Sequence, residues 1–439
     1  GTPSLMAVKL ALVHAAKGGL QHRIMVLDDK SAFLYGEMRR KVYIELPRQD
    51  PRWKEGRVVG VLRKALYGTR DAPQIWGGEV KKTLESMGFS ASVHQPSVFH
   101  HKARGMVVVV HVDDFLCSGE EKDLEWLYDT LRQKYDLKKS VLESSSDDIM
   151  VRYLNRTIRW TTEGLELEGD EKHEEMLKKE WGMEHCKEVE TPITKGFQEQ
   201  STIGEELRED EAKQVRRAIA RINYMAQDRP DLSVAARVLS QCMAHPREGV
   251  RQGVKRVIRY LSGRPRCVLM IPHSFEFNKI EVMTDSDWAG DISTRRSCSG
   301  GSLQFGGATV LHWSKLQSNV ALSSGEAELN AAVKGMSEAI GLSELVHEIF
   351  QIRPGIKLTV DASACKGMLL RQGAGRVKHL TTKQLWVQGA IQSYGVEVSR
   401  TPREFNSADA LTHPTSSAEM DLALDRMGFK VQPHRLRRP

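Results

Sequence analysis

An apolar run that ends in two adjacent aspartates constrains this sequence most. Residues 106–112 (MVVVVHV) are the strongest strand signal in the chain, and a second apolar stretch follows Asp113 and Asp114 at once. A strand, a two-residue tip and a second strand predict a β-hairpin. Because aspartate is common in turns, spacing alone favours a plain surface turn. The four valines before the pair instead indicate a buried strand with two carboxylates at its end.

A second acidic pair closes an earlier apolar run. Asp28 and Asp29 follow residues 24–27 (IMVL), a pattern typical of a buried strand. Carboxylates gathered in space bind Mg²⁺, because this ion prefers oxygen ligands. Two such ions can activate an attacking hydroxyl and stabilise a leaving pyrophosphate. The two acidic clusters together therefore match what nucleotidyl transfer requires.

Four further acids occur in the order strand end, helix, strand end and helix start. They are Asp285, Glu328, Asp361 and Asp409. The surrounding pattern predicts a mixed sheet flanked by helices, in which carboxylates at neighbouring strand ends converge on one crevice. Such a group with two Mg²⁺ suits phosphodiester hydrolysis by an activated water. Taken singly, each acid is more simply a solvated surface residue, because the chain has 57 acidic residues.

The middle of the chain, residues 205–263, is helical in pattern and is divided by Pro230 and Pro246 into three helices. The last helix carries the basic residues Arg251, Lys255, Arg256 and Arg259, which are candidate nucleic-acid contacts. A basic helix face is more often simply solvated. The net charge of +7 nevertheless favours a polyanionic partner.

Several classes of protein are excluded by length and composition. A chain of 439 residues predicts two to four domains. The six cysteines form no CxxC pair, which indicates reduced thiols of an intracellular protein rather than disulfides or a zinc site. The longest apolar run, residues 106–110, is too short to span a membrane. Because the first residue is glycine, we expect a piece processed or excised from a longer chain.

Three stretches, in order, carry a family resemblance. They are residues 27–37 (LDDKSAFLYGE), 62–76 (LRKALYGTRDAPQIW) and 111–114 (HVDD). They resemble the catalytic motifs of the reverse transcriptase of copia-type LTR retrotransposons. The resemblance continues through 228–231 (DRPD) and covers residues 4 to 414 or so.

The second half resembles the ribonuclease H of the same family. The matching stretches are residues 284–291 (TDSDWAGD), 321–328 (ALSSGEAE), 360–363 (VDAS), 406–409 (NSAD) and the pair 378–379 (KH). The resemblance implies that Asp28 and Asp113 hold metal ions with support from Asp114. It implies a second metal site with the ligands Asp285, Glu328, Asp361 and Asp409. Asp287 is a further candidate ligand, and the alternative is that it only caps its strand. Each active site is expected to use two Mg²⁺ ions, with Mn²⁺ as the alternative.

The resemblance also assigns substrate contacts. Phe33 stands where such polymerases place an aromatic that blocks a ribose 2′-OH; a core aromatic explains it equally well. Tyr67, Gly68 and Gln74 are expected near the template and the incoming base, although Gly68 also suits a plain turn. His379 is expected near the scissile strand, and a structural histidine is the alternative.

Two substitutions depart from the family pattern. His111 replaces the usual tyrosine of the hairpin, and Asp71 replaces a glutamine, which adds negative charge near a phosphate path. Most of the N-terminal fingers of the family is also missing. These departures put unaided polymerase activity in doubt.

The expected fold class is an α+β multidomain chain. A right-hand polymerase palm with N-terminally truncated fingers and a helical thumb precedes an α/β ribonuclease H-like domain with a mixed sheet. The expected parts are a palm with partial fingers (1–195), a thumb (196–272), the ribonuclease H-like domain (273–415) and a basic tail (416–439).

The expected function is RNA-directed DNA polymerase with ribonuclease H activity, as part of a retrotransposon polyprotein. The implied partners are an RNA template, a DNA primer, an RNA–DNA hybrid, deoxynucleoside triphosphates and other segments of the same polyprotein, with no membrane. Localisation in cytoplasmic particles and the nucleus is implied by the family. The alternative is a decayed or co-opted copy that binds nucleic acid without polymerising.

Overall fold

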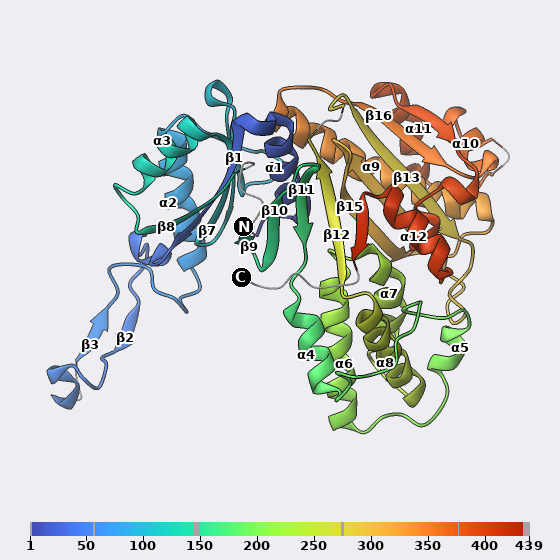
Figure 1. Cartoon of the computed structure of the whole chain (residues 1–439), viewed down its shortest axis with the longest axis horizontal. Coiled ribbons are helices and arrows are strands. Elements are labelled where there is room, and N and C mark those ends of the chain that lie inside the picture. The colour runs from blue at the N-terminus through green and yellow to red at the C-terminus, as the bar shows by residue number, and fades with distance from the viewer. Residues whose placement is uncertain (1, 56–57, 144–149, 274–275, 376, 433–439) are drawn as a thin grey trace. The chain divides into compact units, whose positions relative to one another are not determined.

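The computed structural model describes residues 2–55, 58–143, 150–273, 276–375 and 377–432 (Figure 1). The chain divides into two compact units, Gly1–Leu154 and Asn155–Pro439. Both mix helices and sheets, as the sequence predicts. The finer boundaries expected after residues 195, 272 and 415 stay predictions.

The first unit is built on a six-stranded sheet in the order β4-β5-β6-β7-β1-β8. The interior strand β1 (His22–Asp29) is antiparallel to both β7 (Asp114–Glu120) and β8 (Leu137–Leu142). β6 (Met106–His111) pairs with β7, so the predicted hairpin is present. The remaining strands of this sheet are β5 (Val98–His101) and β4 (Ser90–Ala91).

Helices cover this sheet because its strands are apolar on both faces. Met25 and Leu27 of β1 belong to one buried cluster with α2 (Ala72–Ser86) and α3 (Glu121–Leu131). α1 (Leu5–Gly18), almost entirely buried, packs against β1, β6 and β7. Side chains alternate along a strand, so α1 covers the face opposite to α2 and α3. The other strands of the unit are β2 (Tyr43–Glu45), β3 (Val59–Val61) and β9 (Met150–Tyr153).

The second unit contains the expected mixed sheet, in the order β15-β14-β13-β16-β17. β13 (Lys279–Asp287) is antiparallel to β14 (Cys298–Phe305) and parallel to β16 (Gly355–Val360). The long helix α9 (Ser324–Phe350) packs against β13, β14 and β16 (Figure 1). The remaining elements here are β15 (Ala308–Leu316), β17 (Glu397–Arg400), α10 (Ser363–Leu370) and α11 (Thr382–Ser393).

A helical cluster precedes the mixed sheet along the chain. The three predicted helices are present as α6 (Glu209–Met225), α7 (Ser233–Gln241) and α8 (Glu248–Gly263), and they share one buried apolar core. Two shorter helices accompany them, α4 (Lys172–Glu180) and α5 (Phe197–Ser201). Across the described ranges, no helix is long and apolar enough to cross a bilayer.

The expected basic tail differs from the structure over residues 416–432. There the chain forms α12 (Ser417–Arg426) and β18 (Phe429–Gln432). β18 pairs with β12 (Arg266–Pro272) in a sheet that also contains β11 (Gly164–Glu168) and β10 (Arg156–Trp160). A pairing between strands so distant in sequence leaves no local signal. Residues 433–439 of the predicted tail lie outside the described residues.

A buried ion pair ties the helical cluster together and carries a stability prediction. Asp231 is 1% exposed and accepts hydrogen bonds from Arg229 (2.6 Å) and from the Tyr260 hydroxyl (2.8 Å). Asp231→Ala would leave the buried guanidinium unpaired, so we expect a loss of about 3–5 kcal/mol of unfolding free energy. Urea unfolding of the variant would measure this loss. Asp425→Ala, at an exposed position of α12, is the control, and a similarly small change in both variants would contradict the prediction.

Candidate active sites

Three of the four C-terminal acids gather at one edge of the mixed sheet. Asp285 lies near the end of β13, Asp361 directly follows β16, and Glu328 lies in the first turns of α9. β13 and β16 are parallel neighbours, so their carboxyl ends lie at the same edge. One oxygen from each carboxylate lies within 4.8 Å of the others. We call these three residues the acidic trio.

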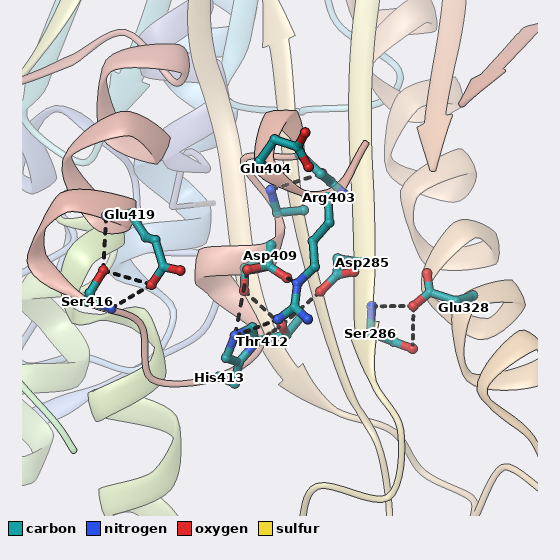
Figure 2. Close-up of polar contacts among 12 residues, drawn as sticks. Asp285, Ser286, Glu328, Arg403, Glu404, Asp409, Thr412, His413, Ser416 and Glu419 are labelled. Atoms are coloured by element: carbon teal, nitrogen blue, oxygen red, sulfur yellow. Dashed lines mark hydrogen bonds and ion pairs between the residues drawn. The ribbon is translucent and has the colours of Figure 1, made fainter. Parts of the chain in front are cut away.

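Glu328 is aimed at this edge by its helix. Ser323 caps α9, because its hydroxyl accepts a hydrogen bond from the Glu326 amide. Glu328 Oε1 accepts hydrogen bonds from the backbone amide (3.0 Å) and the hydroxyl (3.2 Å) of Ser286 (Figure 2). Its other oxygen, Oε2, is buried and has no hydrogen-bond partner. A buried polar atom of this kind calls for a ligand or an ion.

The acidic trio carries unfavourable charge. Burial, followed by repulsion from the other two acids, raises the pKa of Glu328 to about 9. Burial and the charge of Asp361 raise the pKa of Asp285 to about 7, and burial raises the pKa of Asp361 as well. Clustered carboxylates cannot all be ionised without a counter-charge. Three clustered carboxylates, one of them with an unpartnered buried oxygen, suit Mg²⁺, so the residues fit the ion that the sequence predicts.

The fourth predicted acid lies next to the acidic trio rather than in it. Asp409 begins the short helical turn Asp409–Leu411, and its Oδ1 accepts a hydrogen bond from Arg403 Nε at 2.6 Å. Its Oδ2 lies 3.6 Å from His413 Nε2. Thr412, from the same loop, donates to Asp285 Oδ2 at 2.8 Å (Figure 2). Arg403, Thr412 and His413 were not among the predicted site residues.

Two other predicted residues have structural partners here. The carboxylate of Asp287 accepts a hydrogen bond from the Cys298 amide (2.8 Å), which suits the strand-capping alternative. Burial raises the pKa of Asp287. His379 Nε2 lies 3.0 Å from Glu326, two residues before Glu328 on α9. Its role at the scissile strand stays a prediction.

The N-terminal acids meet around the hairpin of the first unit. Asp28 lies directly opposite Asp114 in the β1–β7 register, and the Asp29 amide donates to the carbonyl of Asp113 at 2.9 Å. Backbone pairing therefore brings both acidic clusters together. Within the described part of the chain, the acidic trio is the one group of three whose ligand atoms all lie within 4.8 Å of one another, a distance that Asp28, Asp113 and Asp114 do not meet as a group of three.

The tip of the hairpin is held in an unusual conformation. Val112 has a φ of 54°, a left-handed value that a β-branched residue rarely adopts. The indole Nε1 of Trp76, on α2, donates a hydrogen bond to the Val112 carbonyl. α2 thus supports the turn that presents Asp113. Strain at such a position is often retained because it orients functional side chains.

Asp29 is the acid that sequence reasoning did not select. It is 1% exposed, and its Oδ1 accepts a hydrogen bond from the Ser31 amide at 2.8 Å. Burial raises the pKa of Asp29 to about 6, and burial with the charge of Asp113 raises the pKa of Asp114 to about 6. The adjacent pair in the sequence was the signal for Asp29. Its buried position at the end of β1 indicates a structural role.

Of the predicted substrate contacts of the first unit, Phe33 and Tyr67 lie near the N-terminal acids. Phe33 is 7% exposed, and its ring lies 4.5 Å from that of Tyr67. Tyr67 is half-exposed, and its pKa is raised by burial and by the nearby charges of the acids. Gly68 has a φ of 94°, which suits a turn glycine, and Gln74 is exposed on α2. Their contacts with substrate stay predictions.

The basic face of α8 is largely engaged within the protein. Arg251 forms an ion pair with an acid of α6 at 3.3 Å. Arg256 donates to a threonine hydroxyl (2.8 Å) and Arg259 to a backbone carbonyl (2.6 Å). Lys255 is half-buried on the same helix. Phosphate binding by these four residues would require the three arginines to exchange partners.

One departure from the family pattern is compensated by a neighbour. Asp71 forms an ion pair with Arg40 at 3.0 Å, which lowers the pKa of the Asp71 carboxyl. Its negative charge is therefore matched locally. His111 pairs with Asp114 across the hairpin, next to the acids.

Comparison with known proteins identifies the family. Residues 3–195 match the family described as Reverse transcriptase (RNA-dependent DNA polymerase). Two curated relatives match 98% of this chain. They are the Retrovirus-related Pol polyprotein from transposon TNT 1-94 of Nicotiana tabacum, at 24% identity, and that from transposon RE1 of Arabidopsis thaliana, at 27% identity. The solved structure of LC11-RNase H1 aligns with 31% of this chain and 93% of its own, at 20% identity and a TM-score of 0.25.

The chain belongs to the copia-type retrotransposon Pol polyproteins. The resemblance read from its motifs is thereby confirmed. The matched region covers 32% of the tobacco polyprotein and 29% of the RE1 polyprotein, so the chain spans about a third of the length of these relatives.

Proposed function

We propose that this chain is the reverse transcriptase and ribonuclease H part of a retrotransposon polyprotein, and that it copies RNA into DNA and cleaves the RNA of the resulting hybrid. The observation that carries the proposal is the acidic trio, in which Asp285, Glu328 and Asp361 converge and Glu328 Oε2 is unpartnered. These acids occupy the family's ribonuclease H positions. No other arrangement in the second unit fits a divalent ion as well, within the residues that the structure describes.

The residues of the acidic trio and their neighbours have different roles in the proposed hydrolysis. A bound divalent ion lowers the pKa of its water and stabilises the leaving oxygen. Asp285, Glu328 and Asp361 hold that ion. Ser286 orients Glu328 through two hydrogen bonds, and Thr412 orients Asp285 through one. Such supporting hydrogen bonds typically change metal affinity or activity by about 10–100-fold when removed.

The polymerase site of the proposal lies at the hairpin of the first unit. Asp28 and Asp113 bind Mg²⁺ and Asp114 supports them, while Phe33 excludes a ribose 2′-OH. Support comes from the backbone pairing of β1 with β7 and from the reverse transcriptase family match over residues 3–195.

The proposed organisation assigns the nucleic-acid partners to the parts of the chain. Residues 1–195 form the palm with partial fingers, residues 196–272 the thumb, and residues 273–415 the ribonuclease H-like domain. Template, primer and hybrid contact all three, and the basic face of α8 binds phosphates. Deoxynucleoside triphosphates are the substrates, and other segments of the polyprotein are the expected protein partners.

A cleavage assay tests the proposal most directly. The purified chain is incubated with an RNA–DNA hybrid and Mg²⁺, beside Asp285→Asn and beside a chelator. We expect the RNA strand to be cut only by the wild-type chain with metal. A folded wild-type sample that leaves the RNA intact would overturn the proposal.

The second candidate function is a decayed or co-opted copy that binds nucleic acid without polymerising. The replacement of the usual tyrosine by His111, beside the acids of the hairpin, favours it. It predicts cleavage of RNA, or hybrid binding alone, without nucleotide incorporation.

A further inference from the structure

A single arginine side chain lies against the fourth acid of the ribonuclease H site. Arg403 belongs to the short turn Arg403–Phe405, and its Nε donates to Asp409 Oδ1 at 2.6 Å. Its Nη2 lies 3.0 Å from His413 Nε2. Figure 2 shows the guanidinium next to both of these side chains, on the side of Asp285 away from Glu328. This arrangement holds Asp409 next to the acidic trio and outside it.

The same arginine reaches Asp285 through two intermediates. Because a guanidinium can only donate, His413 Nε2 is the acceptor and Nδ1 carries the imidazole proton. That Nδ1 lies 2.9 Å from Thr412 Oγ1, and the Thr412 hydroxyl donates to Asp285 Oδ2 at 2.8 Å. One guanidinium therefore organises both the first and the fourth acid of the site.

The turn that carries Arg403 is held by contacts of its own, separate from those of the Arg403 side chain. Arg426, on α12, donates to the carbonyl of Glu404 and lies over the Phe405 ring at 4.9 Å. The Arg403 side chain is 64% exposed, and that of Asp409 is 18% exposed. The side chain can thus leave Asp409 while the turn stays in place.

The charge of Arg403 acts on the whole carboxylate group. Its guanidinium forms an ion pair with Asp409 and also attracts the neighbouring carboxylates of Asp285 and Asp361. A divalent ion between these acids would exert the same attraction. The guanidinium and the ion therefore compete for the same negative charge, and each weakens the binding of the other.

We propose that Arg403 is a built-in counter-cation of the ribonuclease H site, which holds Asp409 in the metal-free protein and is displaced from it when the metal binds. The inference rests on the proposed function. Displacement frees a planar, fork-shaped donor at the edge of the site, where a phosphodiester of the hybrid is the complementary anion. Arg403 thus lowers metal affinity before the hybrid arrives and adds a phosphate contact afterwards.

Calorimetric titration with Mn²⁺ tests the first half of this proposal without measuring cleavage. For Arg403→Gln we expect the Mn²⁺ affinity to rise about three- to fivefold, the size set by an exposed ion pair. Arg353→Gln is the matched control, because Arg353 is also 64% exposed and ion-paired, and it precedes β16 at the end away from Asp361. An unchanged or lower affinity in Arg403→Gln overturns the proposal. If the wild-type chain itself binds no Mn²⁺, the proposed function fails instead.

Hybrid binding tests the second half. The probe is a DNA strand paired with a 2′-O-methyl RNA strand, which resists cleavage, in the presence of Ca²⁺. We expect Arg403→Gln to bind this probe about fivefold more weakly at low salt, with a salt dependence reduced by about one phosphate contact. Equal affinity and equal salt dependence in wild type and variant overturn the phosphate contact.

Discussion

Glu328→Gln is expected to abolish RNA cleavage and, at the same time, to stabilise the metal-free protein at alkaline pH. Glu328 supplies one of the three clustered carboxylates and carries the unpartnered buried oxygen Oε2, so replacing its carboxylate by a neutral amide weakens metal binding directly. Loss of about 4 kcal/mol of transition-state stabilisation corresponds to about 10³-fold in rate. The amide keeps the size of the side chain, and its oxygen can still accept from Ser286.

The stability effect follows from the pKa of Glu328. Burial raises that pKa to about 9 in the folded chain, above about 4.3 for an exposed glutamate. Between these values the folded chain binds more protons than the unfolded chain, so the stability contributed by this group falls as pH rises through the folded pKa. Glutamine cannot ionise and does not lose this contribution. The variant should therefore gain on the order of a few kcal/mol over wild type between pH 5 and pH 9.

Thermal unfolding in a chelating buffer at pH 5 and pH 9 measures this difference. Glu338→Gln is the control, because Glu338 lies on α9 in an ordinary ion pair with Lys334 at 2.8 Å. The control should keep its cleavage rate and track the wild-type pH dependence. If the melting temperature of Glu328→Gln falls with pH as much as that of the wild type, the raised pKa of Glu328 is contradicted.

Local patterns predicted the parts of this fold that depend on neighbours in sequence. The valine run before Asp113 forms β6, the proline-divided region forms α6 to α8, and the cap at Ser323 begins α9. Motif order identified the family. Each of these features depends on residues close together in the sequence, so it can be predicted without information on tertiary contacts.

The features that the sequence did not predict depend on contacts between residues far apart in the chain. The role of Arg403 depends on His413 and Asp409 in a loop, and no pattern distinguishes it from other exposed arginines. The pairing of β18 with β12 joins residues more than 150 positions apart, so the segment was expected to be a tail. The buried setting of Asp29 likewise becomes visible only once β1 is enclosed.

Asp113→Asn is expected to lower nucleotide incorporation by at least about 10³-fold without a large change in stability. In the proposed site Asp113 binds metal at the tip of the hairpin, and removing its charge removes several kcal/mol of electrostatic stabilisation from the transferring phosphoryl group. The side chain is only partly buried, and its backbone carbonyl keeps the hydrogen bond from the Asp29 amide. The folded hairpin should therefore persist.

Primer extension on an RNA template with Mg²⁺ measures the effect. Asp129→Asn is the matched control, since Asp129 lies on α3, is 56% exposed and pairs with Arg132. Full primer extension by Asp113→Asn would contradict the assignment of Asp113 to the polymerase site. Ribonuclease H cleavage by the same samples reports whether the second unit is intact.

The wild-type result in that assay separates the two candidate functions. If the wild-type chain extends the primer, the carboxylates at the ends of β1 and β6 hold metal and nucleotide as proposed. If it cleaves the hybrid but extends nothing, the first unit has lost its chemistry while the second has kept its own. That outcome would locate the decay at the hairpin, where His111 replaces the usual tyrosine beside the acids. Restoring tyrosine at this position, as His111→Tyr, should then recover incorporation if the replacement alone is responsible.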